Sequence, residues 1–306
     1  MPPGPPSPTA QPLVMGVLNV TPDSFSDGGR YLDLGDAVAR FVAMVDEGAS
    51  VVDVGGESTR PGAAPVDPDE ECRRVLPVIE AVAPLAVERG VRLSIDTRNE
   101  STARAAVAAG ATLVNDVSAS LWRVAADTGA GWVAMHMLGD PRTMQEHPVY
   151  DDVVDDVRSF LVERARTAAD AGVGEIWIDP GIGFGKTFEH NLQLLARIDE
   201  LVAEGLPVLV ATSRKRFTGV LSARSDAAPG PRLDPAATPG RSPVVGAGAE
   251  GAGTALDEPV DVDDRIEASL ATATWCMASG VRMIRSHDVA ETVQAAVVVG
   301  GDFPTL

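Results

Sequence analysis

Polar side chains that could do chemistry follow several short apolar segments of this chain. Each stands where a buried parallel strand would end and a loop would begin. They are Asn19, Glu57, Asp96, Asn115, Asp116, His136, Asp179, Ser213, Lys215, Arg285 and His287. Acidic and amide residues at such points often only cap the next helix. For Glu57 and Asp116 the capping and the functional interpretations both stay open.

Within this set, some side chains would accept hydrogen bonds from a ligand and others would bind an anion. The acceptors are Asp96, Asn115 and Asp179. The second group is Asn19, Lys215, Arg285 and His287. Carboxylates pair best with a guanidine-like edge, where two N–H groups bind in parallel. Arg285 and His287 precede a predicted helix, Asp288–Val299, whose N-terminus favours an anion. The residues therefore predict a small ligand that is donor-rich at one end and anionic at the other.

Three glycines follow Asp179 at alternate positions, namely Gly181, Gly183 and Gly185. The spacing does not fit a P-loop, because Pro180 stands where the first glycine is required. It also differs from the dinucleotide fingerprint, which needs Gly-x-Gly-x-x-Gly. A backbone this thin lets a flat ligand approach closely. Taken alone, a tight turn with a surface aspartate would explain the stretch equally well.

The elements that must position these residues alternate between two patterns. Short apolar segments typical of parallel strands recur between longer segments with helical periodicity. The predicted strands are Leu13–Asn19, Ser50–Gly55, Val91–Thr97, Thr112–Asp116, Trp132–His136, Glu175–Asp179, Pro207–Thr212 and Val281–Arg285. Eight such rounds predict an α/β fold, a closed (β/α)₈ TIM barrel in a single domain. Active sites of such barrels lie at the carboxyl ends of the strands, which is where the polar residues stand.

Two stretches depart from the alternation. Residues 1–12 are proline-rich, and we predict that they form a disordered tail before a barrel domain of residues 13–306. Residues 223–259 are rich in alanine, glycine and proline and have no periodicity. This composition predicts a disordered, low-complexity insertion after the seventh strand. We favour a solvated linker over a lid.

The composition bounds the partners and the compartment. The formal net charge of −19 over 306 residues leaves no broad basic face for nucleic acid. No apolar run is long enough for a membrane span. Cys72 and Cys276 show neither disulfide-framework nor metal-ligand spacing. We expect a cytoplasmic protein that binds neither nucleic acid nor membrane.

Other barrel chemistries can be compared with the same residues. A metallohydrolase would need a His-x-His pair, which the four histidines do not form. A glycosidase could use Asp96 and Asp179 as its two carboxylates, but the nearby cations suit a phosphorylated ligand better. Lys215 could form a Schiff base, and its cationic neighbours could instead bind phosphate.

Short motifs between Val14 and Val299 occur together in a recognisable order. They are Met15–Gly29, Asp53–Gly62, Ser94–Thr97, Asn115–Ser118, Met135–Met137, Pro141–Gln145, Asp179–Lys186, Ser213–Lys215 and Ile284–Val289. In these motifs the chain resembles dihydropteroate synthase, the pterin-binding enzyme family targeted by sulfonamides. The resemblance implies that (7,8-dihydropterin-6-yl)methyl diphosphate condenses with p-aminobenzoate in folate biosynthesis. The products would be 7,8-dihydropteroate and diphosphate. It also implies Mg²⁺ as cofactor and a homodimer.

The resemblance implies a role for each matching position. The pterin would be held by Asp96, Asn115, Asp179 and Lys215, with apolar contacts from Met135, Gly183 and Phe184. Diphosphate would be bound by Asn19, Arg60, Arg285 and His287. The aminobenzoate pocket would include Phe25, Thr59, Pro61 and Ser213. Asn19 would also help to hold Mg²⁺. The implied catalytic residues are Asp96, Lys215, Arg285 and His287, with Lys215 as a binder rather than a nucleophile.

Two other functions are compatible with some of these motifs. A methyltetrahydrofolate:corrinoid methyltransferase shares the pterin acceptors but ejects no diphosphate, and a non-catalytic pterin-binding paralogue would have no need of the cationic groups. Intact Asn19, Thr59, Arg60 and His287 favour the synthase. The chain also departs from the family in a short segment, Ala119–Gly131, in the long insertion before Val260, and in Ser286, where valine is frequent.

Overall fold

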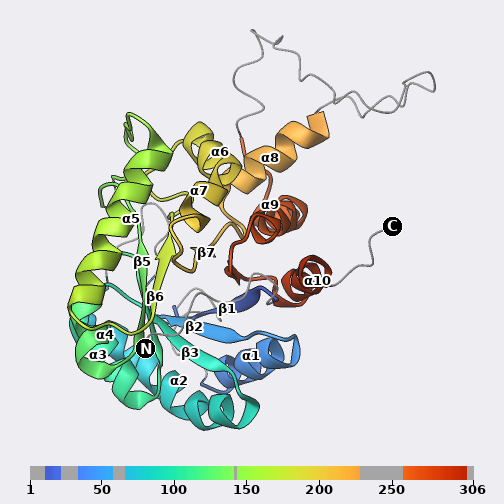
Figure 1. Cartoon of the computed structure of the whole chain (residues 1–306). Coiled ribbons are helices and arrows are strands. Elements are labelled where there is room, and N and C mark those ends of the chain that lie inside the picture. The colour runs from blue at the N-terminus through green and yellow to red at the C-terminus, as the bar shows by residue number, and fades with distance from the viewer. Residues whose placement is uncertain (1–10, 22–33, 58–65, 141–142, 228–257, 302–306) are drawn as a thin grey trace, which may run out of the picture.

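Eight parallel strands form one sheet that closes on itself (Figure 1). The computed structural model describes residues 11–21, 34–57, 66–140, 143–227 and 258–301. The strands are β1 Leu13–Asn19, β2 Val51–Gly55, β3 Arg92–Asp96, β4 Leu113–Asp116, β5 Gly131–Met135, β6 Ile176–Asp179, β7 Leu209–Val210 and β8 Met283–Ser286. Their order is β6-β5-β4-β3-β2-β1-β8-β7, and a parallel bridge between Ile178 and Val208 joins the two ends. The predicted TIM barrel is therefore confirmed.

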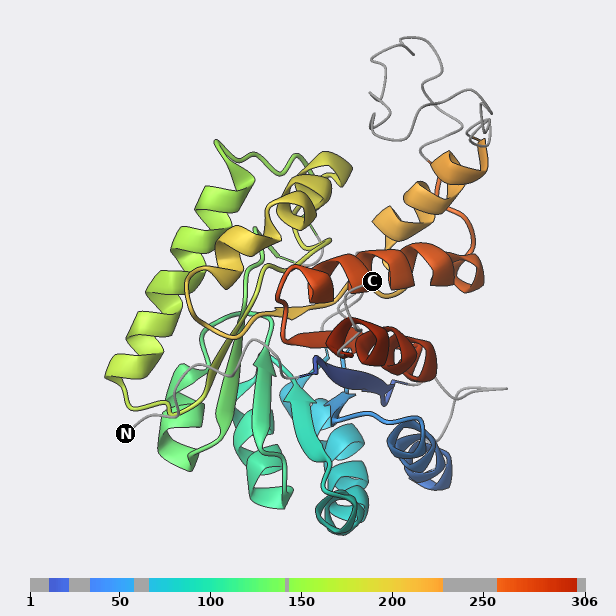
Figure 2. The same cartoon turned by 45° about the vertical axis from the view of Figure 1, so that its right-hand side comes forward.

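Helices surround the strands (Figures 1 and 2). They are α1 Leu34–Asp46, α2 Pro68–Arg89, α3 Glu100–Ala109, α4 Trp122–Thr128, α5 Val153–Asp170, α6 Phe188–Ala196, α7 Ile198–Val202, α8 Arg216–Ala227, α9 Ile266–Ala278 and α10 Val289–Gly300. Their ends carry ordinary signals: the Asp67 side chain caps the start of α2, and Gly90 ends it in the left-handed conformation. In the described part of the chain, no helix has the length and apolar character needed to cross a bilayer.

The predicted insertion begins too early. Helix α8 runs to Ala227, so residues 223–227 are helical, and Arg224 stacks on the Phe188 ring at 4.1 Å. Alanine and arginine are strong helix formers, so a stretch without periodicity can still continue a helix. At the other end, Val260 N donates to Gly219 O at 3.2 Å. Residues 228–257 lie outside the described residues. Of the predicted tail, Pro12 is buried immediately before β1, while residues 1–10 lie outside.

An apolar plug fills the barrel beneath the strand ends. Its members are Met15, Val51, Leu113, Val133, Trp177, Leu209 and Met283, and all are buried. A second, larger core lies between strands and helices, as the alternation of side chains along a strand requires. Two residues after members of the plug come Asp53, Asn115, Met135, Asp179 and Arg285. Because the period of a strand is two, these side chains share the interior face and lie directly above the plug.

Candidate active site at the strand ends

A buried ion cluster occupies the centre of the strand ends. We use this name for Asp53 on β2, Asp96 on β3 and Arg285 on β8. Arg285 Nε donates to Asp53 Oδ2 at 2.7 Å, and Arg285 Nη2 donates to Asp96 Oδ2 at 2.8 Å. Asp53 is fully buried and Asp96 is 8% exposed. The sequence predicts that Arg285 belongs to a cationic group apart from the acids. The structure pairs it with two of them, because buried carboxylates need a counter-charge.

Burial shifts the proton affinity of this cluster. Burial raises the pKa of Asp96 to about 7. The charge of Arg285 lowers this pKa, whereas the nearby carboxylates of Asp53 and Glu71 raise it further. Burial disfavours the Arg285 charge, but Asp53 and Asp96 together hold the pKa of its guanidinium above the ordinary value. Asp96 therefore holds a proton more readily than a free aspartic acid does, although it lies next to a fixed cation.

Asn115 and Asp179 extend the row of acceptors. Asn115 is in register with Asp96 and donates its Nδ2 to Asp53 Oδ2 at 2.9 Å. Asp179 is 3% exposed and accepts from Gly181 N at 2.7 Å. Burial raises the pKa of Asp179, while the Lys215 charge and the Gly181 N–H oppose this shift. Met135 is buried in register with Asp179 on the neighbouring strand.

The glycine-rich loop after β6 is held in place by its backbone. Gly181 has φ +64°, and a Cβ there would collide with the carbonyl oxygen of His136, so only glycine fits. Gly183 N donates to Asn191 Oδ1, and Gln145 Nε2 donates to Gly183 O, both at 2.7 Å. The loop thus keeps one conformation beside the acids.

Lys215 reaches the same loop from the start of α8. Its Nζ donates to Ile182 O and lies 4.6 Å from the centre of the Phe184 ring. Burial lowers the pKa of Lys215 to about 8, although the nearby charge of Asp179 opposes the change. The structure thus brings together the described residues predicted to hold a pterin.

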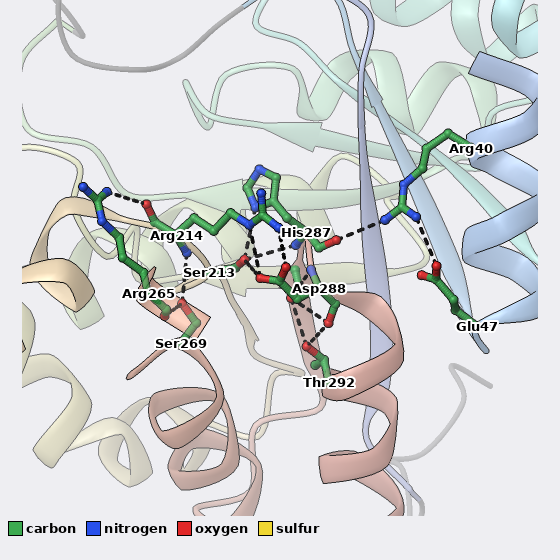
Figure 3. Close-up of polar contacts among 10 residues, drawn as sticks. Arg40, Glu47, Ser213, Arg214, Arg265, Ser269, His287, Asp288 and Thr292 are labelled. Atoms are coloured by element: carbon green, nitrogen blue, oxygen red, sulfur yellow. Dashed lines mark hydrogen bonds and ion pairs between the residues drawn. The ribbon is translucent and has the colours of Figure 1, made fainter. Parts of the chain in front are cut away.

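Ser213, Arg214, His287 and Asp288 form a second group of contacts, which we call the Ser213 cluster (Figure 3). Ser213 Oγ lies 3.1 Å from His287 Nδ1 and accepts from His287 N at 3.1 Å. The Asp288 carboxylate accepts from Arg214 Nε at 3.2 Å and from Arg214 Nη2, and it lies 3.4 Å from Ser213 Oγ. Arg40 donates to the carbonyl oxygen of His287 at 3.1 Å. The loops after β7 and β8 are therefore linked through side chains.

Arg214 adopts a backbone conformation that is unusual for its type. Its φ of +59° is left-handed, which costs a residue with a Cβ about 1 kcal/mol. Arg214 N donates to Ser269 Oγ at 3.1 Å, and Arg265 Nη1 donates to Arg214 O at 3.0 Å. These contacts hold the turn in which Ser213 faces His287 (Figure 3). The same turn places Lys215 against the loop after β6.

The remaining predicted residues divide into three groups. Asn19 ends β1. A Cβ placed on Gly55 would lie 3.6 Å from Asn19 Oδ1 and 3.7 Å from Asp96 Oδ2, so Asn19 borders the ion cluster. Phe25, Thr59, Arg60 and Pro61 lie outside the described residues. Asp116 has a structural role, since it accepts from Ser120 N, Leu121 N and Trp132 Nε1.

Ser286, Glu57 and two of the histidines also have local partners. Ser286 Oγ accepts from Asp288 N at 3.1 Å and lies at the start of α10. Glu57 pairs with Arg98 at 2.7 Å. His190 caps α6 together with Thr187, and His147 is exposed.

Sequence reasoning missed Asp53 and Lys186 as site residues. Asp53 stood in a predicted strand that is otherwise apolar, at an inward position, and that signal could have singled it out. Lys186 follows the three glycines and is 2% exposed. Its Nζ lies 2.9 Å from His136 Nδ1 and donates to Phe184 O at 3.0 Å. Burial lowers the pKa of Lys186 to about 7 and that of His136 to about 3. Lys186 thus ties the glycine-rich loop to β5.

The described residues contain no group of three or more His, Cys, Asp or Glu side chains that could hold a metal ion by themselves. The geometry instead presents three acceptors, a paired arginine and a lysine around one interior face. This arrangement suits a planar ligand whose edge carries N–H donors and whose substituent is anionic.

Comparison with known proteins agrees with this geometry. A family described as "Pterin binding enzyme" matches residues 15–287. Dihydropteroate synthase of Escherichia coli K12 is 40% identical over 296 residues, which cover 95% of this chain and 91% of that protein. A solved structure of the Xanthomonas albilineans enzyme with 4-aminobenzoic acid is 40% identical, with a TM-score of 0.77 over 95% of this chain and 92% of that one. The same enzyme in complex with 7,8-dihydropteroate gives 38% identity and a TM-score of 0.73, covering 95% and 93%.

Proposed function

The chain belongs to the pterin-binding enzyme family, and from this premise we propose that it is a dihydropteroate synthase. It condenses (7,8-dihydropterin-6-yl)methyl diphosphate with p-aminobenzoate and releases diphosphate and 7,8-dihydropteroate. The observation that carries the proposal is the row of buried acceptors, Asp96, Asn115 and Asp179, beside Lys215 and the glycine-rich loop. A pterin presents a guanidine-like edge of N–H donors, which such a row can satisfy.

The pterin occupies the interior face above the apolar plug. Asp96, Asn115 and Asp179 accept from its donor edge, and Lys215 binds beside Phe184. Met135 and Gly183 provide contact surface. A site built to pair with N–H groups rejects analogues that lack them, because its buried acceptors are then left without partners.

Diphosphate departs toward the cationic side of the site. The carbon–oxygen bond breaks early, the pterin methylene gains positive charge, and the bonding electrons leave with diphosphate. Arg285 and His287 neutralise the departing anion, and Asp96 stabilises the positive pterin. The aminobenzoate amine then attacks the methylene carbon and loses a proton. No covalent intermediate with the enzyme is required, so Lys215 acts as a binder.

Several groups complete the proposed substrate sites. Ser213 lies beside His287 and so can contact aminobenzoate next to the anion. Phe25, Thr59 and Pro61 belong to the same pocket in this proposal. Arg60 contributes to diphosphate binding.

Mg²⁺ is the proposed metal. This ion prefers oxygen ligands, and it is usually held by one or two protein groups together with substrate phosphates and water. Asn19 Oδ1 beside Asp96 Oδ2 fits that pattern, since both oxygens border Gly55. Asn19 together with the diphosphate would hold the ion, which would help to neutralise the leaving group.

A homodimer is the proposed assembly. Large apolar side chains are exposed on neighbouring helices α9 and α10 (Figure 2): Trp275 is 55% exposed, Val297 54% and Val298 57%. Two copies that pair through this face would cover them. We place the protein in the cytoplasm, where a reducing environment keeps Cys72 and Cys276 as thiols.

The test is formation of product by the purified chain. The dihydropterin diphosphate, p-aminobenzoate and Mg²⁺ are mixed with the protein, and dihydropteroate is followed by chromatography. We expect product that requires Mg²⁺ and both substrates, and that is lost in Asp96→Ala. Tight pterin binding without product would contradict the proposal and favour a methyltransferase or a non-catalytic pterin-binding protein.

A further inference from the structure

We propose that Asp53 is a positioning residue that sets the hydrogen-bond polarity of Asn115 and fixes the guanidinium of Arg285. It would thereby make the pocket selective for a ligand edge that donates. The inference rests on the proposed function, because it assumes that the ligand lies against Asn115 and Asp96. Asp53 has no role as a ligand contact or as a catalytic residue in this proposal. It acts only through its two neighbours.

The position of Asp53 is costly for a purely structural residue. It lies in the middle of β2 and points into the barrel, two residues after Val51 of the apolar plug. Its side chain is fully buried, and Oδ1 has no hydrogen-bond partner among the described residues. A well-packed apolar side chain at such a place is often as stabilising as a buried ion pair, or more so. The carboxylate is therefore best explained by what it does to the residues that bind it.

The first effect concerns the amide of Asn115. An asparagine side chain has a donor end and an acceptor end, and a half-turn about its last bond exchanges them. Asn115 Nδ2 donates to Asp53 Oδ2 at 2.9 Å. The opposite orientation would place the amide oxygen against the carboxylate, where two acceptors repel. Asp53 thus keeps Oδ1 of Asn115 as the end available to a ligand, and the pocket presents an unbroken row of acceptors.

The second effect concerns Arg285. Asp53 Oδ2 accepts from Arg285 Nε at 2.7 Å, and Asp96 Oδ2 accepts from Arg285 Nη2 at 2.8 Å. Carboxylates from two strands therefore bind the same guanidinium group. A planar group held at two of its corners cannot rotate or withdraw freely. Without Asp53, Arg285 would keep Asp96 as its only partner in the ion cluster and would be free to cover the carboxylate that the pterin needs. Asp53 therefore serves the acceptor row through both of its partners.

The test uses two ligands that differ along one edge of the ring. One is a 6-substituted pterin, and the other is the matching lumazine, in which a carbonyl oxygen replaces the 2-amino group and N1 carries a hydrogen. Their dissociation constants are measured by calorimetry with the unsubstituted chain and with Asp53→Asn. An amide at position 53 can donate to Asn115 Oδ1, so Asn115 can turn its own donor toward the ligand. We expect the pterin to bind about 10-fold more weakly or worse and the lumazine to change by less than about 3-fold.

Two further variants make the measurement decisive. Ser94→Ala is the control, because Ser94 is in register with Asp53, is fully buried and has no partner for its Oγ in the described structure. It should leave both constants unchanged within about 2-fold. The double variant Asp53→Asn with Asn115→Asp exchanges donor and acceptor between the two positions. Because an acceptor again faces the ligand, the preference for pterin should return to within about 3-fold of the original.

The outcomes separate the inference from the proposed function. Equal weakening of pterin and lumazine in Asp53→Asn would show that Asp53 only supports packing, and would overturn the inference. So would a double variant that fails to recover the preference. If the single variant does not fold, the double variant and Ser94→Ala still decide the question. Absence of dihydropteroate with the unsubstituted chain would remove the proposed function, whereas the ratio of the two dissociation constants would still report on Asp53.

Discussion

The two sides of the site are held by different physical means. The buried ion cluster lies on regular strands, where Asp53 is fully buried and Asp96 is 8% exposed. The Ser213 cluster lies on loops, and its Arg214 side chain is 37% exposed. In the ion cluster, burial raises the pKa of Asp96. In the Ser213 cluster, hydrogen bonds hold Arg214 in a left-handed backbone conformation. Charge state should therefore govern binding on the strand side, and loop geometry should govern it on the loop side.

The largest effect is expected from Asp179→Asn. This change removes the charged acceptor of two N–H donors on the buried edge of the pterin. It should weaken pterin binding by about 2 to 4 kcal/mol. Calorimetry with a pterin ligand measures it. Asp127→Asn is a suitable control, because Asp127 forms an exposed pair with Arg104 far from the site. An unchanged affinity in Asp179→Asn would break the link between buried charge and binding.

A smaller effect should appear in the pH dependence of stability. The pKa of Asp96 in the folded chain is raised to about 7, above its value in an unfolded chain. The folded state therefore holds an extra proton between about pH 4 and 7, and the free energy of unfolding falls as pH rises through this window. Urea denaturation should show a loss of the free energy of unfolding over this window that is absent in Asp96→Asn. If the free energy of unfolding depended on pH in the same way in both proteins, burial of Asp96 would not control the charge state of the ion cluster.

Arg214 tests the other side of the comparison. Arg214→Ala loses the pair with Asp288 and keeps the left-handed strain, so it should destabilise the chain by about 1 to 2 kcal/mol and raise the KM for p-aminobenzoate. Arg214→Gly loses the same pair but adopts the conformation without strain, and should cost less. Thermal unfolding and initial rates measure both. A glycine variant as impaired as the alanine variant would mean that the ion pair, rather than the backbone, maintains the loop.

The smallest effect on the fold is expected from Val298→Asp on α10. Val298 is exposed, so the free energy of unfolding of the subunit should change by less than about 0.5 kcal/mol. Sedimentation should nevertheless show weaker self-association, because a charge would enter the proposed dimer face. Since α10 follows the Ser213 cluster, a change in aminobenzoate KM that accompanies dissociation would show that the loop side depends on the partner subunit. An unaltered dimer would contradict the proposed face.

The barrel, and the level in it at which the site lies, could be predicted from the amino-acid pattern. The predicted strand Leu13–Asn19 is observed with the same bounds, and the other predicted strands lie within two residues of the observed ones at both ends. This success has a simple cause. Parallel strands covered on both faces are apolar along their length, and a polar residue at the carboxyl end interrupts that pattern visibly. Asp96, Asn115 and Asp179 could therefore be selected before any contact was known.

Which charged side chains meet depends on the three-dimensional fold. Arg285 and Asp53 are 232 residues apart in the chain, and their contact exists because closure of the sheet places β8 and β2 on either side of β1. Local pattern carries no information about such a pair. The same holds for Lys186 beneath the glycine-rich loop and for the left-handed turn at Arg214, which depends on Ser269, Arg265 and Asp288. Periodicity specifies which face a side chain occupies, whereas its partner is set by the closed barrel.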